Sequence, residues 1–239
     1  MGITTRILPA LWTQDNTNLR AENYQGIPFL TFYENNFSAS GIFYKRILDI
    51  VGGIVGTVIF SILFPFVALA IKMDSPGPVL FRQERVGQNG RIFKLYKFRS
   101  MSSDAEMIKE QLLKNNEMKG AMFKITNDPR ITRVGKWLRK TSIDEIPQFL
   151  NVLKGEMSLV GTRPPTPDEV KQYTDSHYRR ISMKPGITGL WQISGRSAIT
   201  DFDEIVELDC AYLANWRFLN DIKILFKTVW VIIQRKGAV

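Results

Sequence analysis

Residues Ile50 to Ile71 read IVGGIVGTVIFSILFPFVALAI and contain no charged side chain. In a helix that rises about 1.5 Å per residue, these roughly 22 residues span about 33 Å, enough to cross the hydrocarbon core of a bilayer. No other stretch of the sequence is as long and as apolar. It begins too late and is too long for a secretory signal peptide, so we expect it to be retained and to hold the protein at a membrane.

Pro65 interrupts this stretch and leaves two membrane topologies open. A proline lacks the backbone N–H and clashes with the carbonyl four residues earlier, that of Ser61, so the helix should bend there. A kinked spanning helix is one outcome, and a helix that breaks at Pro65 and leaves by the face it entered is the other. Basic residues favour the cytoplasmic side of a membrane. They flank both ends of the stretch, at Lys45 and Arg46 and again at Lys72, Arg82 and Arg85. Charge alone therefore weights the two topologies evenly.

The composition narrows the class of partner. The 239 residues carry a formal net charge of +9, which suits nucleic acid, an anionic membrane surface or phosphorylated substrates. The apolar stretch favours the last two, and the aromatic residues are not interleaved with the basic ones as a base-stacking platform requires, so we expect no nucleic-acid partner. Cys210 is the only cysteine and His177 the only histidine, which excludes a disulfide framework and a multi-histidine metal site.

The pattern divides the chain into three parts and predicts an α+β fold that is mostly α-helical. Residues 1–40 have no sustained period and read as a peripheral or poorly ordered extension. Residues 41–73 form the membrane helix, and residues 74–239 form a cytosolic domain. That domain carries one β-hairpin signal, Asn89-Gly90 between two β-prone runs, and its remaining segments read mainly as helices. The segment 201–233 predicts two helices divided near Asn220-Asp221. The second is amphipathic and could lie on a membrane surface or pack on the core.

An acidic pair, Asp144 and Glu145, stands just before a helix expected to begin near Pro147. A carboxylate at a helix start is most often a cap, and Ser142 with Glu145 fits a capping box. Two adjacent carboxylates are more than a cap requires, however, and a dense basic helix precedes them. From the residues alone, a cap and a catalytic pair both remain open.

Arginines on either side of this pair are candidate phosphate ligands. Arg139 ends the basic helix within residues 126–140, and Arg163 is fixed between small residues and prolines after a short strand, which suits bidentate phosphate binding. The glycine-rich segment 184–196 would let backbone approach a ligand closely. Weaker candidates for the rim of the same pocket are Lys97, Arg99, Gln192 and Arg196.

Several blocks of sequence together resemble one family. They are KRILDI before the apolar stretch, the proline inside it, SPGPVLFRQERVG, FKLYKFRSM, DPRITRVGKWLRKTSIDEIPQFLNVLKGEMSLVGTRP and KPGITGLWQISGR. These blocks resemble the bacterial sugar transferases, which are monotopic phosphoglycosyl transferases, or polyprenyl-phosphate hexose-1-phosphate transferases. The resemblance covers roughly Tyr44 to Lys236, and its central blocks are long and specific.

The resemblance implies a re-entrant membrane helix broken at Pro65, with a cytosolic catalytic domain at the inner membrane of a bacterium. It implies transfer of a sugar 1-phosphate from a UDP-sugar to undecaprenyl phosphate, with Mg²⁺ as cofactor and UMP as leaving product. Asp144 falls on the position of the family's nucleophile and Glu145 on that of its metal-associated partner. Arg139 and Arg163 fall on positions linked to phosphate and nucleotide binding. Membrane lipids are implied contacts, and a homodimer is compatible with the resemblance.

Two positions depart from the family pattern, which usually has Ser before the breaking proline and Pro-Arg-Pro around the arginine. This chain has Phe64 and Thr162-Arg163-Pro164 there. Phe64 removes a hydroxyl that could satisfy a freed carbonyl, a role that Ser61 could take over. Larger relatives carry an N-terminal bundle of membrane helices, and this sequence resembles the minimal form with a modest extension.

Two other functions compete with this reading. A glycosyltransferase that releases UDP could bind a metal through the triplet Asp201-Phe202-Asp203, although such a triplet is short and common. A membrane-tethered basic adaptor would explain the charge and the amphipathic end but not an acidic pair among fixed arginines. The sugar and the polymer pathway cannot be read from these residues.

Overall fold

The computed structural model describes residues 18–24, 27–33, 38–112, 114, 116–195 and 199–234. The candidate Arg196 lies outside these residues. Within them the elements are β1 (Asn18–Tyr24), β2 (Ile27–Tyr33), α1 (Ala39–Asp74), β3 (Leu80–Val86), η1 (Gln88–Gly90), β4 (Ile92–Phe98), α2 (Ala105–Leu112), α3 (Arg133–Lys140), η3 (Ile143–Gln148), α4 (Phe149–Lys154), β5 (Ser158–Val160), α5 (Pro167–Val170), α6 (Asp175–Tyr178), η4 (Arg179–Ile181), β6 (Gly186–Thr188), α7 (Leu190–Ile193), α8 (Phe202–Ala214) and α9 (Phe218–Gln234). The predicted, mostly helical fold with a small antiparallel hairpin is confirmed.

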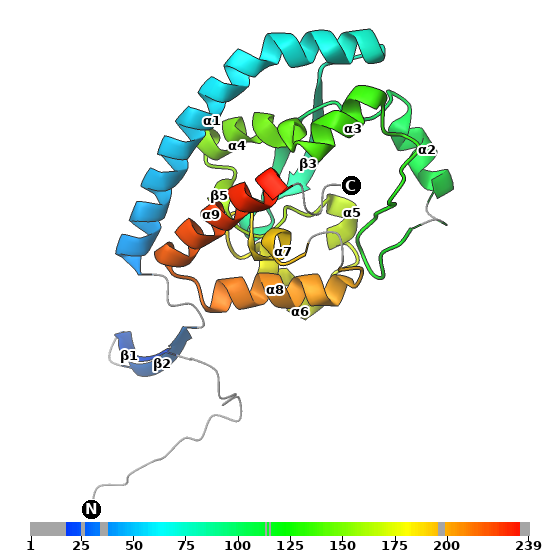
Figure 1. Ribbon diagram of the computed structural model, residues 1–239. Coiled ribbons are helices and arrows are strands. Elements are labelled where there is room, and N and C mark those ends of the chain that lie inside the picture. The colour runs from blue at the N-terminus through cyan, green and yellow to red at the C-terminus, as the bar shows by residue number, and fades with distance from the viewer. Residues whose placement is uncertain are drawn as a thin grey trace, which may run out of the picture.

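Helix α1 is the frame on which the domain is assembled. Ser38 caps it by accepting a hydrogen bond from the backbone N–H of Gly41, and it ends where Ser75 turns to extended backbone. Among the described residues it is the one helix long and apolar enough to cross a membrane. Figure 1 shows it rising beside the domain and bending over the top, and its helical geometry continues through Pro65. The prediction of a bend is confirmed, but the expected break is wrong: the proline lies inside one helix.

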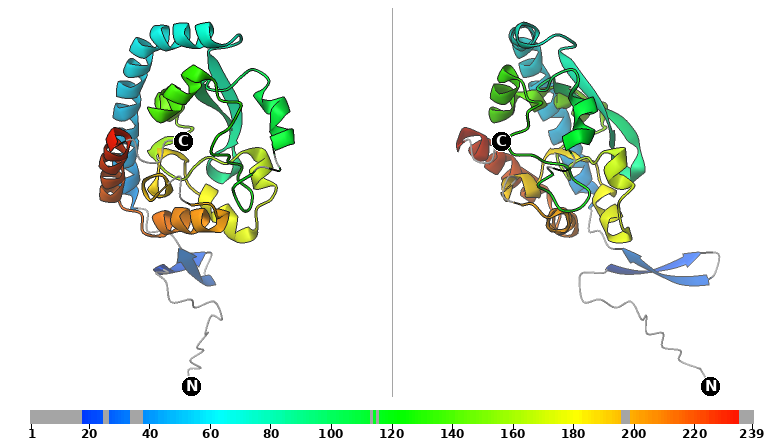
Figure 2. Two further views of the ribbon diagram at one scale, coloured as in Figure 1. Left: turned by 45° about the vertical axis from the view of Figure 1, so that its right-hand side comes forward. Right: turned by 90° about the vertical axis from the view of Figure 1, so that its right-hand side faces the viewer.

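Three glycines allow the first half of α1 to lie close to the domain. A Cβ added at Gly52 would meet Leu159 at 2.5 Å, and one added at Gly56 would meet the ring of Phe149 at 2.1 Å. A Cβ added at Gly53 would likewise meet the side chain of Leu153, at 2.8 Å. Helix α4 and strand β5 therefore pack directly on the α1 backbone, which larger side chains would prevent. Both views in Figure 2 show α9 beside this half of α1.

The second half of α1 packs on the hairpin and α3. Val67 and Ile71 are buried in a cluster with Phe98 of β4 and Leu138 of α3. Phe64 stacks on Phe98, with ring centroids 6.1 Å apart. Aromatic packing thus holds Phe64 at the position where the family usually has a serine. The Ser61 hydroxyl does not bond to the carbonyl that Pro65 frees, which was the role expected of it. The Ser61 hydroxyl donates to the carbonyl of Thr57, one turn before the carbonyl that Pro65 leaves without its helical donor.

The hairpin predicted around Asn89-Gly90 is present as β3 and β4. These strands pair antiparallel from Leu80 opposite Phe98 to Val86 opposite Ile92. Asn89 and Gly90 both adopt left-handed backbone, with φ of 55° and 80°, inside the loop that joins the strands. Asn and Gly are the residues that tolerate this conformation best, so the turn follows from local chemistry.

A second small sheet brings the Arg163 segment to the centre of the domain. Strands β5 and β6 pair in parallel, with Ser158 opposite Gly186. A Cβ added at Gly186 would lie 2.1 Å from the backbone nitrogen of Gly161. One close approach of this glycine-rich segment is therefore between two strands of the protein, and Gly186 also lines the cavity described below.

Residues 18–24 and 27–33, in the segment expected to be peripheral or poorly ordered, pair as the antiparallel strands β1 and β2; Figure 2 shows these strands outside the main body. One local prediction is wrong. The last two helices separate at residues 215–217, and not at Asn220-Asp221. Asp221 lies in the first turn of α9 and is fully buried, because it accepts hydrogen bonds from Tyr212 and Trp216.

Candidate active site

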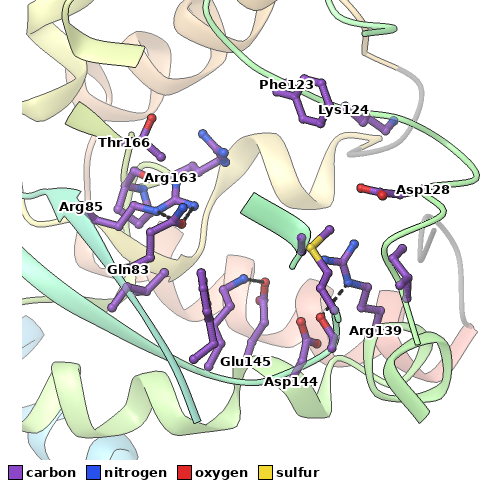
Figure 3. A pocket seen from close by; sticks show the side chains of 18 of the residues that line it. Gln83, Arg85, Phe123, Lys124, Asp128, Arg139, Asp144, Glu145, Arg163 and Thr166 are labelled. Carbon is purple, nitrogen blue, oxygen red and sulfur yellow. Dashed lines mark hydrogen bonds and ion pairs between the residues drawn. The ribbon is translucent and has the colours of Figure 1, made fainter. Parts of the chain in front are cut away.

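A cavity of about 500 Å³ lies between the β3–β4 hairpin, η3, the end of α3, the segment around residues 118–131 and α7. Its lining includes every site residue predicted from sequence that the structure describes: Asp144, Glu145, Arg139, Arg163, Lys97, Arg99 and Gln192. These side chains come from positions up to 95 residues apart in the chain, and the fold gathers them around one space (Figure 3).

The acidic pair is part of the cavity wall and not a helix cap. Asp144 and Glu145 lie within the 3-10 helix η3, and Asp144 is 7% exposed. Ser142 precedes them in left-handed backbone, with a φ of 56°, and its side chain makes no capping hydrogen bond. The capping-box interpretation is therefore wrong, and the catalytic interpretation of this pair keeps its support. Lys97 on β4 donates to Glu145 over 2.9 Å, which fixes that carboxylate at the cavity edge.

Arg139 reaches the same end of the cavity because α3 lies against the strand that leaves the hairpin. Thr132 caps α3 through the N–H of Gly135, and a Cβ at Gly135 would stand 2.0 Å from the carbonyl oxygen of Ser100. With the helix so close, the Nε of Arg139 donates to the Ser100 hydroxyl over 3.0 Å. Figure 3 shows Arg139 beside Asp144, as a shared phosphate site requires.

Arg163 lines the cavity but already has a partner within the chain. Its two terminal nitrogens donate to the two carboxylate oxygens of Glu169 over 2.9 and 3.2 Å. Burial alone would raise the pKa of Glu169, but the Arg163 guanidinium outweighs it and holds the pKa below its usual value. Arg85 lies next to this pair and donates to the carbonyl of Pro164 over 2.9 Å. Burial and the neighbouring Arg163 lower the pKa of Arg85 to about 10.

The weaker candidates divide by role. Lys97 supports Glu145, as described above. Arg99 is buried, and its guanidinium donates to the carbonyls of Ser75 and Pro76, so it clamps the turn that ends α1 while still forming part of the cavity wall. The side-chain oxygen of Gln192 is buried at the wall and has no hydrogen-bond partner among the described residues.

Sequence reasoning missed part of the wall. Asp128 and Arg130 form a buried ion pair with an N–O distance of 2.6 Å, and Arg130 stacks over the ring of Phe123 at 5.3 Å. Phe123 and Lys124 lie across the cavity from the acidic pair in Figure 3. The composition of residues 127–130, NDPR, is typical of a turn, and nothing in it indicates that the segment faces the cavity.

The triplet Asp201-Phe202-Asp203 has a structural explanation. The Asp201 carboxylate caps α8 by accepting from the N–H of Asp203. Asp203 is exposed and lies 3.0 Å from the ring of His177, while Phe202 is buried in a core cluster. Neither aspartate lines the cavity, so this observation disfavours a metal-binding role for the triplet.

The residues present fit a magnesium ion that is held largely by substrate. Among the described residues, no group of three or more acidic, histidine or cysteine side chains gathers in one place. Asp144 and Glu145 supply two oxygen donors, which is the number that Mg²⁺ uses when phosphates and waters complete its shell. The nearby cations Lys97 and Arg139 suit those phosphates.

A family model described as bacterial sugar transferase matches residues 40–235. The chain belongs to the bacterial sugar transferase family. The match covers α1, the hairpin, the acidic pair and both arginine segments, so every candidate residue lies inside it.

Named relatives of this sugar transferase agree with the family. It is 52% identical over 239 residues to "Galactosyl transferase CpsE" of Streptococcus agalactiae, covering 100% of this chain and 53% of the relative. It is 43% identical over 227 residues to "Undecaprenyl-phosphate galactose phosphotransferase" of Salmonella typhimurium, covering 93% and 47%. It is 38% identical over 198 residues to "Exopolysaccharide production protein ExoY" of Rhizobium meliloti, covering 81% and 87%. The chain thus spans about half the length of the first two relatives and most of the third.

Proposed function

We propose that the protein transfers a sugar 1-phosphate from a UDP-sugar to undecaprenyl phosphate and releases UMP. The observation that carries this proposal is the single cavity in which the buried Asp144 and its neighbour Glu145 meet Arg139, Lys97 and Arg163. A carboxylate among fixed cations suits phosphoryl chemistry, and the Salmonella typhimurium relative is named as an undecaprenyl-phosphate galactose phosphotransferase. Galactose is the first sugar to test, because two of the most similar relatives are named for it.

The mechanism uses Asp144 twice. Its carboxylate oxygen attacks the β-phosphorus of the UDP-sugar, and the bond from that phosphorus to the bridging oxygen breaks, so UMP leaves with the electron pair. A phosphate oxygen of undecaprenyl phosphate then attacks the same phosphorus. The bond to Asp144 breaks, which regenerates the carboxylate and yields undecaprenyl-diphospho-sugar.

The remaining charged residues of the cavity bind the substrate phosphates or orient the acidic pair. Arg139 and Arg163 bind phosphate oxygens, Arg163 while it remains oriented by Glu169. Lys97 keeps Glu145 at the cavity edge. A magnesium ion bound by Asp144 and Glu145 would neutralise charge that develops on the phosphates.

We also propose that α1 is re-entrant, with the catalytic domain on the cytoplasmic face of the inner membrane. Contacts at both ends of the helix support this. Near its start, Lys45 donates to Asp221 over 2.6 Å and to the carbonyl of Val160 over 2.8 Å. At its end, Asp74 accepts from the N–H of Val134 over 3.0 Å. A spanning helix would place its two ends on opposite faces of the membrane, but here both ends bond to the same domain.

Cysteine labelling tests this topology. Ser40 and Met73 are exposed at the two ends of α1, so each can be changed to cysteine in a Cys210→Ser background. A membrane-impermeant thiol reagent should label both sites from the cytoplasmic side of inverted vesicles and neither from the outside of intact spheroplasts. Labelling of the two sites from opposite sides would show that α1 spans the membrane and would contradict the re-entrant topology.

The reaction is tested by product analysis with purified full-length protein, Mg²⁺, undecaprenyl phosphate and a panel of UDP-sugars. We expect UMP from at least one sugar, and a loss of at least 10³-fold for Asp144→Asn, because the amide is not a nucleophile. Asp168→Asn, which changes an exposed carboxylate outside the cavity lining, serves as the control and should keep wild-type activity. UDP as the product would favour the glycosyltransferase alternative, and no product with any sugar would favour the adaptor.

A further inference from the structure

Thr162 lies immediately before Arg163, at the position where the family usually has the first proline of Pro-Arg-Pro. It is 2% exposed and does not belong to the lining of the catalytic cavity. Its hydroxyl donates to the backbone carbonyl of Arg180 over 2.8 Å, across 18 residues of the chain. A proline side chain has no hydrogen-bond donor, so the family's usual residue could not make this bond.

Arg180 is a firmly held partner for this hydrogen bond. It is fully buried in η4, and its Nε and one terminal nitrogen donate to the same carboxylate oxygen of Asp209, over 3.1 and 2.7 Å. Its other terminal nitrogen donates to the Tyr173 hydroxyl over 2.9 Å, and its guanidinium lies 5.2 Å from the ring centre of Phe202. Separating a buried ion pair is costly, so this network holds Arg180 in one place.

The backbone on both sides of Arg163 is held as well. Before it, the carbonyl of Thr162 accepts from the N–H of Gly186 over 2.9 Å. After it, the carbonyl of Pro164 accepts from the guanidinium of Arg85 over 2.9 Å. The Thr162 hydroxyl therefore adds a side-chain link to a segment whose backbone is already tied to two other parts of the domain.

We propose that Thr162 is a positioning residue for Arg163. Its hydroxyl fixes the start of the Arg163 segment on the buried pair of Arg180 and Asp209, so that the Arg163 guanidinium meets the substrate phosphates at the cavity wall. Without this bond the segment would sample more positions, and fewer of them would present the guanidinium to a phosphate. This inference rests on the proposed function, in which Arg163 binds phosphate, and adds the contact that places this ligand.

Kinetics of matched variants test the proposal. Thr162→Val removes the hydroxyl, and Thr188→Val makes the same change in β6, at a 5% exposed threonine outside the cavity lining whose hydroxyl lies 2.7 Å from that of Thr228. We expect kcat/KM for the UDP-sugar to fall about fivefold in Thr162→Val, the loss typical of one neutral hydrogen bond, and to stay within about twofold of wild type in Thr188→Val. Thr162→Ser keeps a hydroxyl and should also stay within about twofold of wild type. Equal losses in the two valine variants would overturn the proposal.

A double-mutant cycle shows whether Thr162 acts through Arg163. Thr162→Val is introduced into the wild-type protein and into Arg163→Gln, and kcat/KM is measured for the four proteins with a radiolabelled UDP-sugar. Once the guanidinium is gone, the valine should change kcat/KM by less than about 1.5-fold, because it has no phosphate ligand left to displace. A fivefold loss in the Arg163→Gln background as well would contradict the proposal, since it would show general damage to the site.

Hydrogen–deuterium exchange tests the same link in the ligand-free full-length protein, whatever its activity. The amide of Gly186, which donates to the Thr162 carbonyl, should exchange at least about threefold faster in Thr162→Val than in wild type or Thr188→Val. Unchanged exchange there would overturn the positioning role of Thr162.

These results separate the inference from the function on which it rests. If the wild-type protein releases no UMP from any UDP-sugar, the proposed function fails, whereas the exchange data still report whether the Thr162 hydroxyl holds the segment. If UMP is released but Thr162→Val matches wild type in kcat/KM and in exchange, only the role of Thr162 is wrong.

Discussion

The ion pair between Lys45 and Asp221 should be the most sensitive link between α1 and the domain. The two side chains are 8% and 0% exposed, and the N–O distance is 2.6 Å. Asp221 also accepts hydrogen bonds from Tyr212 over 2.8 Å and from Trp216 over 3.2 Å. Substitution Asp221→Asn keeps the volume but leaves the Lys45 ammonium buried without a carboxylate, bonded to the carbonyl of Val160 over 2.8 Å.

The expected loss of stability follows from the burial of this ion pair. Removing one partner of a buried pair costs about 3–5 kcal/mol, because the other charge stays desolvated. For a chain of this size, 1 kcal/mol corresponds to roughly 2–4 °C in Tm, so Asp221→Asn should lower Tm by about 10 °C. The double variant Lys45→Met/Asp221→Asn removes both charges and keeps a side-chain oxygen that can accept from Tyr212 and Trp216. It should recover at least half of that loss, because no unpaired charge stays buried.

The assay is thermal unfolding of the detergent-solubilised full-length protein, followed by intrinsic tryptophan fluorescence. The control is Asp168→Asn, which breaks the ion pair with Lys171 at 2.8 Å, where the side chains are 76% and 75% exposed. Such an exposed pair contributes about 0–1 kcal/mol, so Tm should fall by less than roughly 3 °C. The reasoning is refuted if Asp221→Asn lowers Tm no more than Asp168→Asn does.

Two further predictions concern the arginine segments. Gly135→Ala places a methyl group against the carbonyl of Ser100, where an ideal Cβ would lie at 2.0 Å; we expect a loss of about 1–3 kcal/mol by the same unfolding assay, and slower UMP release because the Arg139 contact to Ser100 moves. Glu169→Gln should lower stability at pH 7, because the depressed pKa of Glu169 means that its pairing with Arg163 stabilises the fold above the ordinary glutamate pKa. That difference from wild type should begin to shrink as pH falls below about 4.5, where the unfolded-state carboxylate takes up a proton. It should be lost once pH is below the depressed pKa of Glu169, where the folded-state carboxylate is protonated as well; a difference that is constant with pH would contradict the pairing.

Local chemistry made some elements predictable. The left-handed turn at Asn89-Gly90 depends on two residues that tolerate positive φ, and Gly155 ends α4 in the same conformation, with a φ of 79°. The long apolar run from Ile50 to Ile71 could be predicted to be a helix long enough to cross a membrane from its length and its lack of charge alone. In each case the residues that determine the structure are neighbours in sequence.

Predictions failed where residues far apart in the sequence determine the local structure. Asn220-Asp221 has the composition of a turn, but Asp221 is drawn into the core by Lys45, 176 residues earlier. The capping box of Thr166 and Glu169 could have been anticipated from its spacing and the proline in the first turn, and the structure contains it. The spacing does not indicate that the same Glu169 also pairs with Arg163. Ser142 and Glu145 show the same spacing, yet the left-handed backbone at Ser142 directs that side chain away from a cap.

The basic residues at the start of α1 link membrane attachment to the catalytic site. Sequence patterning treats Lys45 and Arg46 as topology signals, but the structure uses both inside the domain: Arg46 donates to the carbonyls of Val152 and Leu153 over 3.1 Å. Lys45 binds the carbonyl of Val160, three residues before Arg163. At the other end of α1, Asp74 binds the start of α3, the helix that carries Arg139. A change in the bend of α1 would therefore displace the two arginine segments relative to each other, so the proposed membrane helix also determines the spacing of the proposed phosphate ligands.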